Sequence, residues 1–527
     1  MQADNNYILA IDLGTSGPKV ALVSIQGELV GSEFEATQLM LLPDGGAEQS
    51  PADWWQAITN AVKRLLGKGL VSNDKIVAIA TTGQWSGTVP VDQDGVALGN
   101  AIIWMDARGA PFIKQIAMGM INIEGYAPEK LYKWLQLTGG VPAQAGKDPI
   151  AHILYLKHEH ADLYNRTHKF LEPVDYIGMR LTGQIAASYN SIVLHWLTDN
   201  RDINNIPYND TLIKISTIDR AKLPTLKPVN SVLGSLSPDI AREWGLRKDV
   251  RVVMGSPDIH SAAVGSGAVR DFETHLYIGT SSWLTCHVPF KKTDILHSLA
   301  ALPSAIPGRY LLTDEQETAG ACLQFLRDNI LFHEDELSNG EKPKNAYKLF
   351  DRIAERTPAG SERLIFTPWL YGERAPVDDH LVRGGFFNQS LQTTREHMVR
   401  AVFEGVAYNS RWLLKYVEGF IKHRVDGINF VGGGAKSDIW CQIHADILDR
   451  PIRQMKDPIE VNVRGAALLA SAALGYLDYN EIGSCVQVAK SYIPNPDHRK
   501  LYDELFGEFI AIYQNNKKIY ARLNRAR

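Results

Sequence analysis

Cysteine is scarce in this sequence. Its 527 residues include four cysteines, Cys286, Cys322, Cys441 and Cys485, which lie far apart and form no C-x-x-C pair. Neither a zinc site nor a disulfide framework is therefore indicated. We expect these cysteines to be buried, reduced thiols.

Long apolar runs and an excess of one charge are also missing. No stretch approaches the roughly 18 apolar residues of a membrane span, and the start, MQADNNY, lacks the basic region and apolar core of a leader. We therefore expect a cytoplasmic protein with no membrane partner. The 55 basic and 59 acidic residues give a net charge of −4, so nucleic acid is not expected as a partner either. Whether the chain forms a homodimer stays open.

No low-complexity stretch or Pro/Ser-rich linker marks a domain boundary, although the chain exceeds the roughly 250 to 300 residues at which single cores stop growing. We place the boundary near Val269, because a helix predicted from Ser256 ends around Ala268 and a new strand follows soon after. The predicted domains are residues 1–269 and 270–527.

Strand-like runs alternate with longer amphipathic segments, a pattern that predicts an α/β fold with flanking helices. The clearest strands are residues 8–12, 20–24, 76–81, 250–254, 276–279 and 428–431, and helical periodicity is plain at 52–66, 394–420 and 438–448.

The common phosphate-binding fingerprints are absent: there is no G-x-x-x-x-G-K-[ST] loop, and Gly265 and Gly267 do not complete G-x-G-x-x-G. Instead, residues 7–20 read YILAIDLGTSGPKV, an apolar strand that carries Asp12 into a turn containing Thr15 and Ser16. Glycine amides and hydroxyls suit a phosphate, and a carboxylate at the strand end suits Mg²⁺. An ordinary hairpin with an incidental acid is the alternative.

A similar unit recurs in the second half, at residues 275–283, HLYIGTSSW, where a strand enters a turn of Gly279, Thr280 and Ser281. Two such loops could face a terminal phosphate from opposite sides of a cleft. The pair favours nucleotide binding between two similar lobes.

Asp258, in the segment VMGSPDIHSAAVG, is the strongest candidate for acid-base chemistry. Ser256 is placed to cap the predicted helix and Pro257 suits its first turn. The positive end of the helix would keep the Asp258 carboxylate ionised and able to accept a proton. A plain first-turn acid is an equally good interpretation.

A polar cluster lies between the two hairpin sequences. Amides, an acid, an arginine and indoles suit a sugar, whose hydroxyls need directional partners and whose apolar face packs on an aromatic ring. If residues 104–108 are extended, alternate side chains share one side. The candidates are Gln84, Trp85, Ser86, Trp104, Asp106 and Arg108. For Trp104 alone, core packing is the alternative.

Near the carboxyl end, FVGGGAKSDIW joins a strand to a helix through glycines. A backbone without side chains can lie flat against a purine, so Gly433, Gly434 and Ala435, followed by Asp438, form a candidate adenosine platform. A tight turn without a ligand is the alternative.

Together, these segments resemble the FGGY family of carbohydrate kinases, in the actin-like and sugar-kinase ATPase superfamily. The resemblance spans essentially the whole chain, from AIDLGTSGPKV through AEQSPADWW, GQWSG, IIWMDARG, GSPDIHSAAVGSG, YIGTSSW, TPWLYGERAP, GGFFNQS and AVFEGVAY to VGGGAKSDIW. Its xylulokinase-like branch is closest, because W-x-D-x-R and GERAP match that pattern. The resemblance implies two actin-like, ribonuclease H-like ATPase domains with a mixed sheet and a cleft between them.

It also implies roles for the candidate residues. Asp258 would be the general base, Asp12 would hold Mg²⁺, and Thr15 and Ser16 would face the γ-phosphate of ATP. The second hairpin, Gly279 to Ser281, would hold the inner phosphates. The glycine turn and Asp438 would contact adenosine, and the polar cluster would frame a small sugar or polyol.

The implied activity is an ATP- and Mg²⁺-dependent kinase for a ketopentose or related polyol, with D-xylulose as the first candidate. Many xylulokinases have Gln-Met-His where this chain has Gln84, Trp85 and Ser86, so ribulose, ribitol, erythritol or a heptulose stay open. From other classes, the chain could be an ATPase of the actin or heat-shock type, or a catalytically silent sugar-binding regulator.

Overall fold

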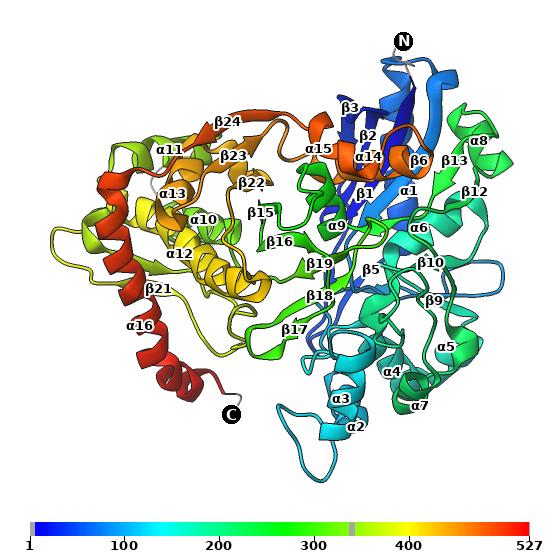
Figure 1. Cartoon of the computed structure of the whole chain (residues 1–527), viewed down its shortest axis with the longest axis horizontal. Helices are drawn as coiled ribbons and strands as arrows, with labels where there is room; N and C mark the ends of the chain where they lie inside the picture. The colour runs from blue at the N-terminus through cyan, green and yellow to red at the C-terminus, as the bar shows by residue number, and fades with distance from the viewer. Residues whose placement is uncertain (1–5, 337–342, 526–527) are drawn as a thin grey trace.

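The computed structural model describes residues 6–336 and 343–525 and contains two mixed β-sheets, one from each half of the chain (Figure 1). Residues 1–5, which belong to the start used above to argue against a leader, lie outside the described residues. None of the helices within the described residues is long and apolar enough to cross a membrane.

The amino-terminal sheet has the strand order β12-β13-β6-β1-β2-β3, and β14 also pairs with β6. β1 runs antiparallel to β2 and parallel to β6, and β13 continues the parallel arrangement beside β6. The strands are β1 (Tyr7–Gly14), β2 (Gly17–Ser24), β3 (Leu29–Phe34), β6 (Ile76–Gly83), β12 (Val232–Ser235), β13 (Arg251–Val253) and β14 (Ser256–Pro257).

The carboxy-terminal sheet repeats this plan in the order β17-β18-β19-β16-β15-β22-β23-β24. β15 is antiparallel to β16 and parallel to β22, as β1 is to β2 and β6. The strands are β15 (Thr274–Ile278), β16 (Ser282–Val288), β17 (Thr293–Asp294), β18 (Leu299–Pro303), β19 (Tyr310–Thr313), β22 (Ile428–Val431), β23 (Ile452–Met455) and β24 (Val488–Tyr492).

The repeated plan confirms the predicted fold class, and the predicted strands lie in β1, β2, β6, β13, β15 and β22. The three helices predicted at residues 52–66, 394–420 and 438–448 are also present. They are α1 (Pro51–Gly67), α12 (Arg395–Ile421) and α13 (Asp438–Leu448). α1 begins where it does because the Ser50 side chain accepts a hydrogen bond from the Asp53 amide and Pro51 occupies the first turn.

Two helices lie between the sheets. On β1, Leu9, Ile11 and Leu13 pack into the core with α1, whereas Ile8 and Ala10 face α14 (Val461–Ala473), a helix from the carboxy-terminal half. Conversely, α9 (Asp258–Gly265), from the amino-terminal half, packs with residues of β16, β22 and β23. Because the halves exchange helices in this way, the boundary at residue 269 stays a prediction.

The cysteines follow the expectation for reduced thiols in most respects. All four are free, and Cys286, Cys322 and Cys441 are buried. Cys485 is only partly buried, so the prediction of burial is wrong for that residue.

Candidate active site

The two predicted phosphate loops are equivalent hairpin turns. Thr15 and Ser16 connect the antiparallel strands β1 and β2, and Gly279 to Ser281 connect β15 and β16. Gly17 closes the first turn with φ of +139°, and a Cβ there would lie 2.0 Å from the Glu35 carbonyl oxygen. Only glycine fits that position. Ser16 and Thr280 are exposed, so both turns present a hydroxyl to solvent.

Asp12 lies near the end of β1, on the face of the sheet that α14 covers. Its Oδ2 accepts a hydrogen bond of 3.1 Å from Asn462 Nδ2, whereas its buried Oδ1 has no hydrogen-bond partner among the described residues. Burial raises the pKa of this carboxyl, and the charge of Lys19 opposes the shift.

A free carboxylate oxygen beside a phosphate loop fits Mg²⁺. This ion is commonly held by one or two carboxylates together with water and substrate phosphates. The described residues contain no cluster of three or more His, Cys, Asp or Glu placed to hold a metal ion. The donor set therefore matches a metal carried by the nucleotide better than an ion caged by the protein.

Asp258 lies at the same edge of the sheet as Asp12. Both Asp12 and Ser256 pair with Thr82 on β6, so the end of β1 and the segment that leads into α9 flank the end of β6 on its two sides. Asp258 is partly exposed and occupies the first turn of α9, so its carboxylate is accessible to a ligand.

The details of this turn differ from the sequence prediction. α9 runs from Asp258 to Gly265, not from Ser256 to Ala268. Ser256 does not cap it, because Ser256 belongs to β14 and its hydroxyl accepts a 2.6 Å hydrogen bond from Asn190. Pro257 is the N-cap residue.

The expectation that Asp258 stays ionised is also wrong for the free protein. Burial, followed by the negative charge of Asp12, raises the pKa of Asp258 to about 8. The hydrogen bond from the Ile259 amide lowers it by less. Loss of hydration and a second carboxylate thus outweigh the helix terminus.

The loop after β6 contains three of the predicted sugar-binding residues. Gln84 donates a 2.8 Å hydrogen bond to Gln49, which itself donates to the Thr15 carbonyl, so the loop is tied to the first hairpin. Gln84 Oε1 is buried without a hydrogen-bond partner within the described residues. Trp85 donates to the Ser191 carbonyl and Ser86 to the Lys147 carbonyl, each at 2.8 Å.

The segment that contains Trp104, Asp106 and Arg108 is a turn, so the predicted extended geometry is wrong. The Asp106 amide bonds to the Ile103 carbonyl, and the Asp106 carboxylate accepts from the Arg108 amide, which bends the chain. Trp104 Nε1 donates a 3.0 Å hydrogen bond to Thr15 Oγ1 and thereby reaches the first hairpin.

Asp106 and Arg108 are engaged mainly with the protein itself. The Arg108 guanidinium donates to Asp106, to Glu48 at 2.6 Å and to the Tyr155 hydroxyl at 3.1 Å. Asp106 is 1% exposed and also accepts from the Ala47 amide. This ion pair braces the turn behind Trp104.

A wall of charged residues from the second half of the chain was missed at the sequence level. Arg374 donates to Glu317 and Glu315, and Lys147 Nζ, from the first half of the chain, lies 4.0 Å from Glu317. Burial raises the pKa of Glu315, while Arg374 counteracts this, and the charge of Glu315 contributes to the raised pKa of Asp258. Only the GERAP motif, which contains Arg374, hinted at this wall.

The glycine turn after β22 is a short helical turn, η7 (Gly433–Lys436), that leads into α13. Gly433 is exposed. Gly434 packs so closely that a Cβ would lie 2.7 Å from Ile278, and Ala435 is fully buried. The accessible part of the predicted platform is therefore the backbone near Gly433.

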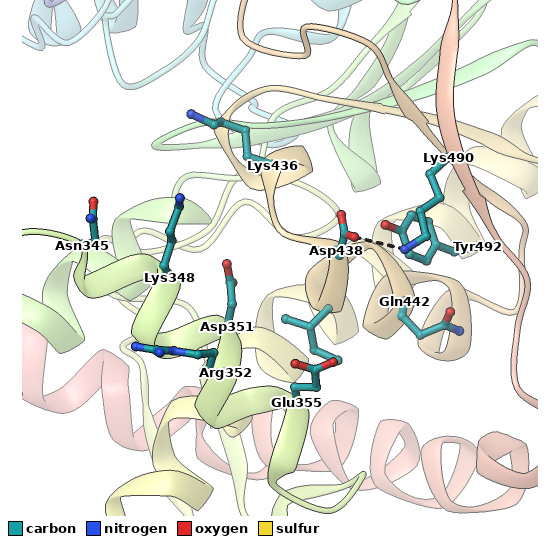
Figure 2. A pocket seen from close by; sticks show the side chains of 11 residues that line it. Asn345, Lys348, Asp351, Arg352, Glu355, Lys436, Asp438, Gln442, Lys490 and Tyr492 are labelled. Carbon is teal, nitrogen blue, oxygen red and sulfur yellow. Dashed lines mark hydrogen bonds and ion pairs between the residues drawn. The ribbon is translucent and has the colours of Figure 1, made fainter.

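A cavity of about 730 Å³ opens beside this turn, between α11 (Ala346–Arg356), α13 and β24 (Figure 2). The side chains of Lys348 and Lys436 extend into the space between α11 and η7 in this view. Asp438 lines the cavity as well, but its carboxylate is paired with Lys490 at 3.1 Å. The volume of this cavity and the lysine side chains that line it suit a nucleotide.

Two repeated sheets, with a similar hairpin turn on each, have the arrangement of a two-domain ATPase of the actin-like class. Within that class, the chain belongs to the FGGY family of carbohydrate kinases. The model of the family's N-terminal domain matches residues 7–265, and that of its C-terminal domain matches residues 276–474. The protein is therefore a sugar kinase, and ATP as the phosphoryl donor follows from the family.

Individual relatives agree with the xylulokinase-like resemblance. A xylulose kinase from Staphylococcus epidermidis is 30% identical over 98% of both chains. Two solved structures from Lactobacillus acidophilus, a ligand-bound xylulose kinase and a gluconate kinase, each have a TM-score of 0.85 and 26% identity, and cover 98% of this chain and 100% of their own.

Proposed function

We propose that the protein transfers the γ-phosphate of ATP, in the presence of Mg²⁺, to a primary hydroxyl of a ketopentose or related polyol, with D-xylulose as the first candidate. One observation carries the proposal: the partly exposed Asp258 carboxylate stands in the first turn of α9, at the same sheet edge as Asp12. Similarity to xylulose kinases supports the choice of sugar.

Asp258 acts as the general base in this scheme. A carboxylate with a pKa of about 8 in the free enzyme is well matched to taking a proton from a hydroxyl near neutral pH. The proton of the acceptor hydroxyl moves to Asp258 as the hydroxyl oxygen attacks the γ-phosphorus, and the bond between the γ-phosphorus and the oxygen that bridges to the β-phosphate breaks, so that ADP leaves. Asp258 then returns this proton to solvent after the product leaves.

The hairpins position the phosphates. Thr15 and Ser16 face the γ-phosphate from the amino-terminal side, and Gly279, Thr280 and Ser281 hold the inner phosphates from the other. Mg²⁺, when bound, supplies neutralisation of phosphate charge, and Asp12 would hold it through the free Oδ1. Phosphoryl transfer relies mainly on such positioning and charge stabilisation.

The adenosine end of ATP belongs at the glycine turn. The backbone at Gly433 and Gly434, with Ala435 buried behind it, directly precedes Lys436 and Asp438, which line the cavity. Lys348 and Lys436 bring positive charge to the phosphates or ribose.

The sugar lies against the loops that follow β6 and precede α2 (Ala110–Ala117). Gln84 offers its free Oε1 to a hydroxyl, and the indole of Trp104 offers an apolar face. Trp85 and Ser86 shape the loop. Asp106 and Arg108 contribute by bracing the turn that carries Trp104.

Gluconate is a second candidate, because a gluconate kinase matches the fold as well as a xylulose kinase does. The charges favour a neutral acceptor instead. Asp12, Glu315 and Glu317 bring carboxylates to the site and Asp258 adds no positive charge, whereas Arg374 is already paired with Glu315 and Glu317. A substrate carboxylate would depend on Lys147, which Glu317 already faces.

The test is a coupled ADP-release assay with Mg-ATP and a panel of D-xylulose, D-ribulose, ribitol, erythritol, a heptulose and gluconate. We expect strong stimulation by one neutral ketose or polyol and little by gluconate. Acceptor-independent ATP hydrolysis alone would favour an ATPase of the actin type. Sugar binding without any ADP release would favour a silent regulator.

A further inference from the structure

A short segment between β23 and α14 touches the glycine turn of the nucleotide site. The Gly432 amide, at the start of that turn, donates a 2.8 Å hydrogen bond to the Pro458 carbonyl. This bond joins two backbone groups, so a displacement of the turn is passed directly to residues 457–460.

The same segment holds the first hairpin of the amino-terminal half. Lys19, directly opposite Asp12 in the β1–β2 register, donates a 2.7 Å hydrogen bond to the Ile459 carbonyl and pairs with Glu460 at 3.2 Å. Glu460 also accepts a hydrogen bond from Ser32 on β3. Residues 458–460 thus contact both the glycine turn at Gly432 and the first hairpin.

Asn462, in the first turn of α14, makes the contact nearest the chemistry. Its Nδ2 donates to Asp12 Oδ2 at 3.1 Å. Asp12 Oδ1 and Asn462 Oδ1 are both buried and without a hydrogen-bond partner in the described part of the chain. Buried polar oxygens are rarely left unpaired, so two of them side by side mark a place for a water molecule, an ion or a ligand.

We propose that Asn462 is a positioning residue for Asp12, and that residues 458–462 couple the nucleotide turn at Gly432 to the direction in which Asp12 presents its free Oδ1. The inference rests on the proposed Mg-ATP function. A hydrogen bond to one oxygen of a carboxylate fixes the orientation of the other, as partners behind metal ligands commonly do.

The first test is ADP binding by calorimetry with and without Mg²⁺, on wild type, Asn462→Ala and Asn462→Asp. We expect ADP affinity without Mg²⁺ to stay within about twofold, because Asn462 does not line the nucleotide cavity. The gain in ADP affinity caused by Mg²⁺ should fall about tenfold or more in Asn462→Ala, because loss of a partner behind a metal ligand typically costs about 10–100-fold in metal affinity. Asn462→Asp, which replaces the donor by a second charge, should lose more.

Asn429→Ala is the matched control. Asn429 also crosses between the halves, from β22 to the Ser266 carbonyl at 2.9 Å, without touching Asp12. It should keep the full Mg²⁺ gain. Thermal melting of each variant shows that the fold is retained, and the KM for sugar should stay unchanged in Asn462→Ala while the Mg²⁺ requirement rises.

Amide hydrogen exchange tests the coupling itself. Addition of ADP should slow exchange in residues 456–463 and in the hairpin at 12–17 of wild type, and Asn462→Ala should lose only the hairpin response. An equal hairpin response in both proteins, or an undiminished Mg²⁺ gain in the variant, would overturn the role of Asn462. A wild type with no Mg²⁺ gain at all, tested first, would instead overturn the proposed metal role of Asp12 and this inference with it.

Discussion

Gly265 and Gly465 lie at the crossing of α9 and α14, where the two halves of the chain meet backbone to backbone. A Cβ on Gly265 would lie 1.9 Å from the Val461 carbonyl oxygen, and one on Gly465 would lie 1.8 Å from the Ser261 carbonyl oxygen. α9 carries Asp258 at its start, and α14 carries Asn462 in its first turn. The close approach therefore sets the distance between the candidate base and the residue that contacts Asp12.

Replacing Gly465 by alanine should destabilise the protein, because the helices must separate to admit a methyl group. Overpacking of this kind costs about 1–3 kcal/mol or more, which outweighs the better helix propensity of alanine. Thermal melting measures the loss. Gly507→Ala is the control, because Gly507 is exposed on α16 (Arg499–Asn524) with no atom near the added Cβ, and it should gain roughly 0.5–1 kcal/mol. Equal melting temperatures of the two variants would contradict the crossing.

Strand and helix periodicity predicted the scaffold well, because β1, β6 and α12 are long and bury a regular apolar face. The first hairpin turn could also be predicted, because the positive φ that this turn needs falls on Gly17, within the turn sequence itself. Contacts between distant segments were not. Asn462 lies 450 residues from Asp12, and nothing in the local sequence of either residue signals their hydrogen bond.

Local rules also failed where several charges share one buried space. The helix start alone predicted an ionised Asp258, but burial raises its pKa, and the negative charges of Asp12 and Glu315, from other parts of the chain, raise it further. The Trp104 segment was misjudged because the Asp106 carboxylate bonds to its own backbone two residues on. Side-chain spacing cannot show that competition.

Asp12→Asn should weaken the use of Mg-ATP more than the binding of sugar. The substitution keeps the shape of the side chain but removes the charge that would hold the metal, so the Mg²⁺ concentration for half-maximal rate should rise at least about tenfold. Steady-state rates against Mg²⁺ at fixed ATP and sugar measure this. Excess Mg²⁺ should restore part of the rate in Asp12→Asn and none in Asp258→Asn. An unchanged Mg²⁺ dependence would count against the role of Asp12.

Trp104→Phe tests whether the hydrogen bond between Trp104, a candidate sugar-binding residue, and Thr15 in the first hairpin matters for turnover. The variant keeps an aromatic face but loses the hydrogen bond to Thr15 Oγ1, worth roughly 1 kcal/mol, so kcat/KM for sugar should fall about fivefold with a loss in kcat. Trp85→Phe is the control, because its lost bond goes to Ser191 and leaves the hairpin untouched. It should alter KM for sugar alone. Identical effects of the two variants would show that the Thr15 contact is irrelevant to turnover.

Asp258→Asn should abolish phosphoryl transfer while leaving ADP binding largely intact, and wild-type kcat/KM should rise with pH until about 8, where the base is ionised. A wild-type kcat/KM that is flat from pH 6 to 9 would remove Asp258 as the titrating base.

The same substitution has a signature in stability. The folded protein holds the Asp258 proton more tightly than the unfolded chain, whose Asp pKa is about 3.9. The free energy of unfolding of the wild type therefore falls as pH rises from about 4 towards 8. The asparagine in the variant does not titrate, so the variant lacks this loss. Because Asp258 is partly exposed, we expect the variant to gain on the order of 2 kcal/mol over wild type at pH 9 and nothing at pH 4. Denaturant unfolding at both pH values measures the difference. Asp239→Asn, at a side chain that is 90% exposed on α8 (Pro238–Trp244), should show no comparable gain. If the stability gain of Asp258→Asn does not grow with pH, Asp258 is ionised in the folded protein at all these pH values. The proposal that its pKa is matched to neutral pH would then be wrong.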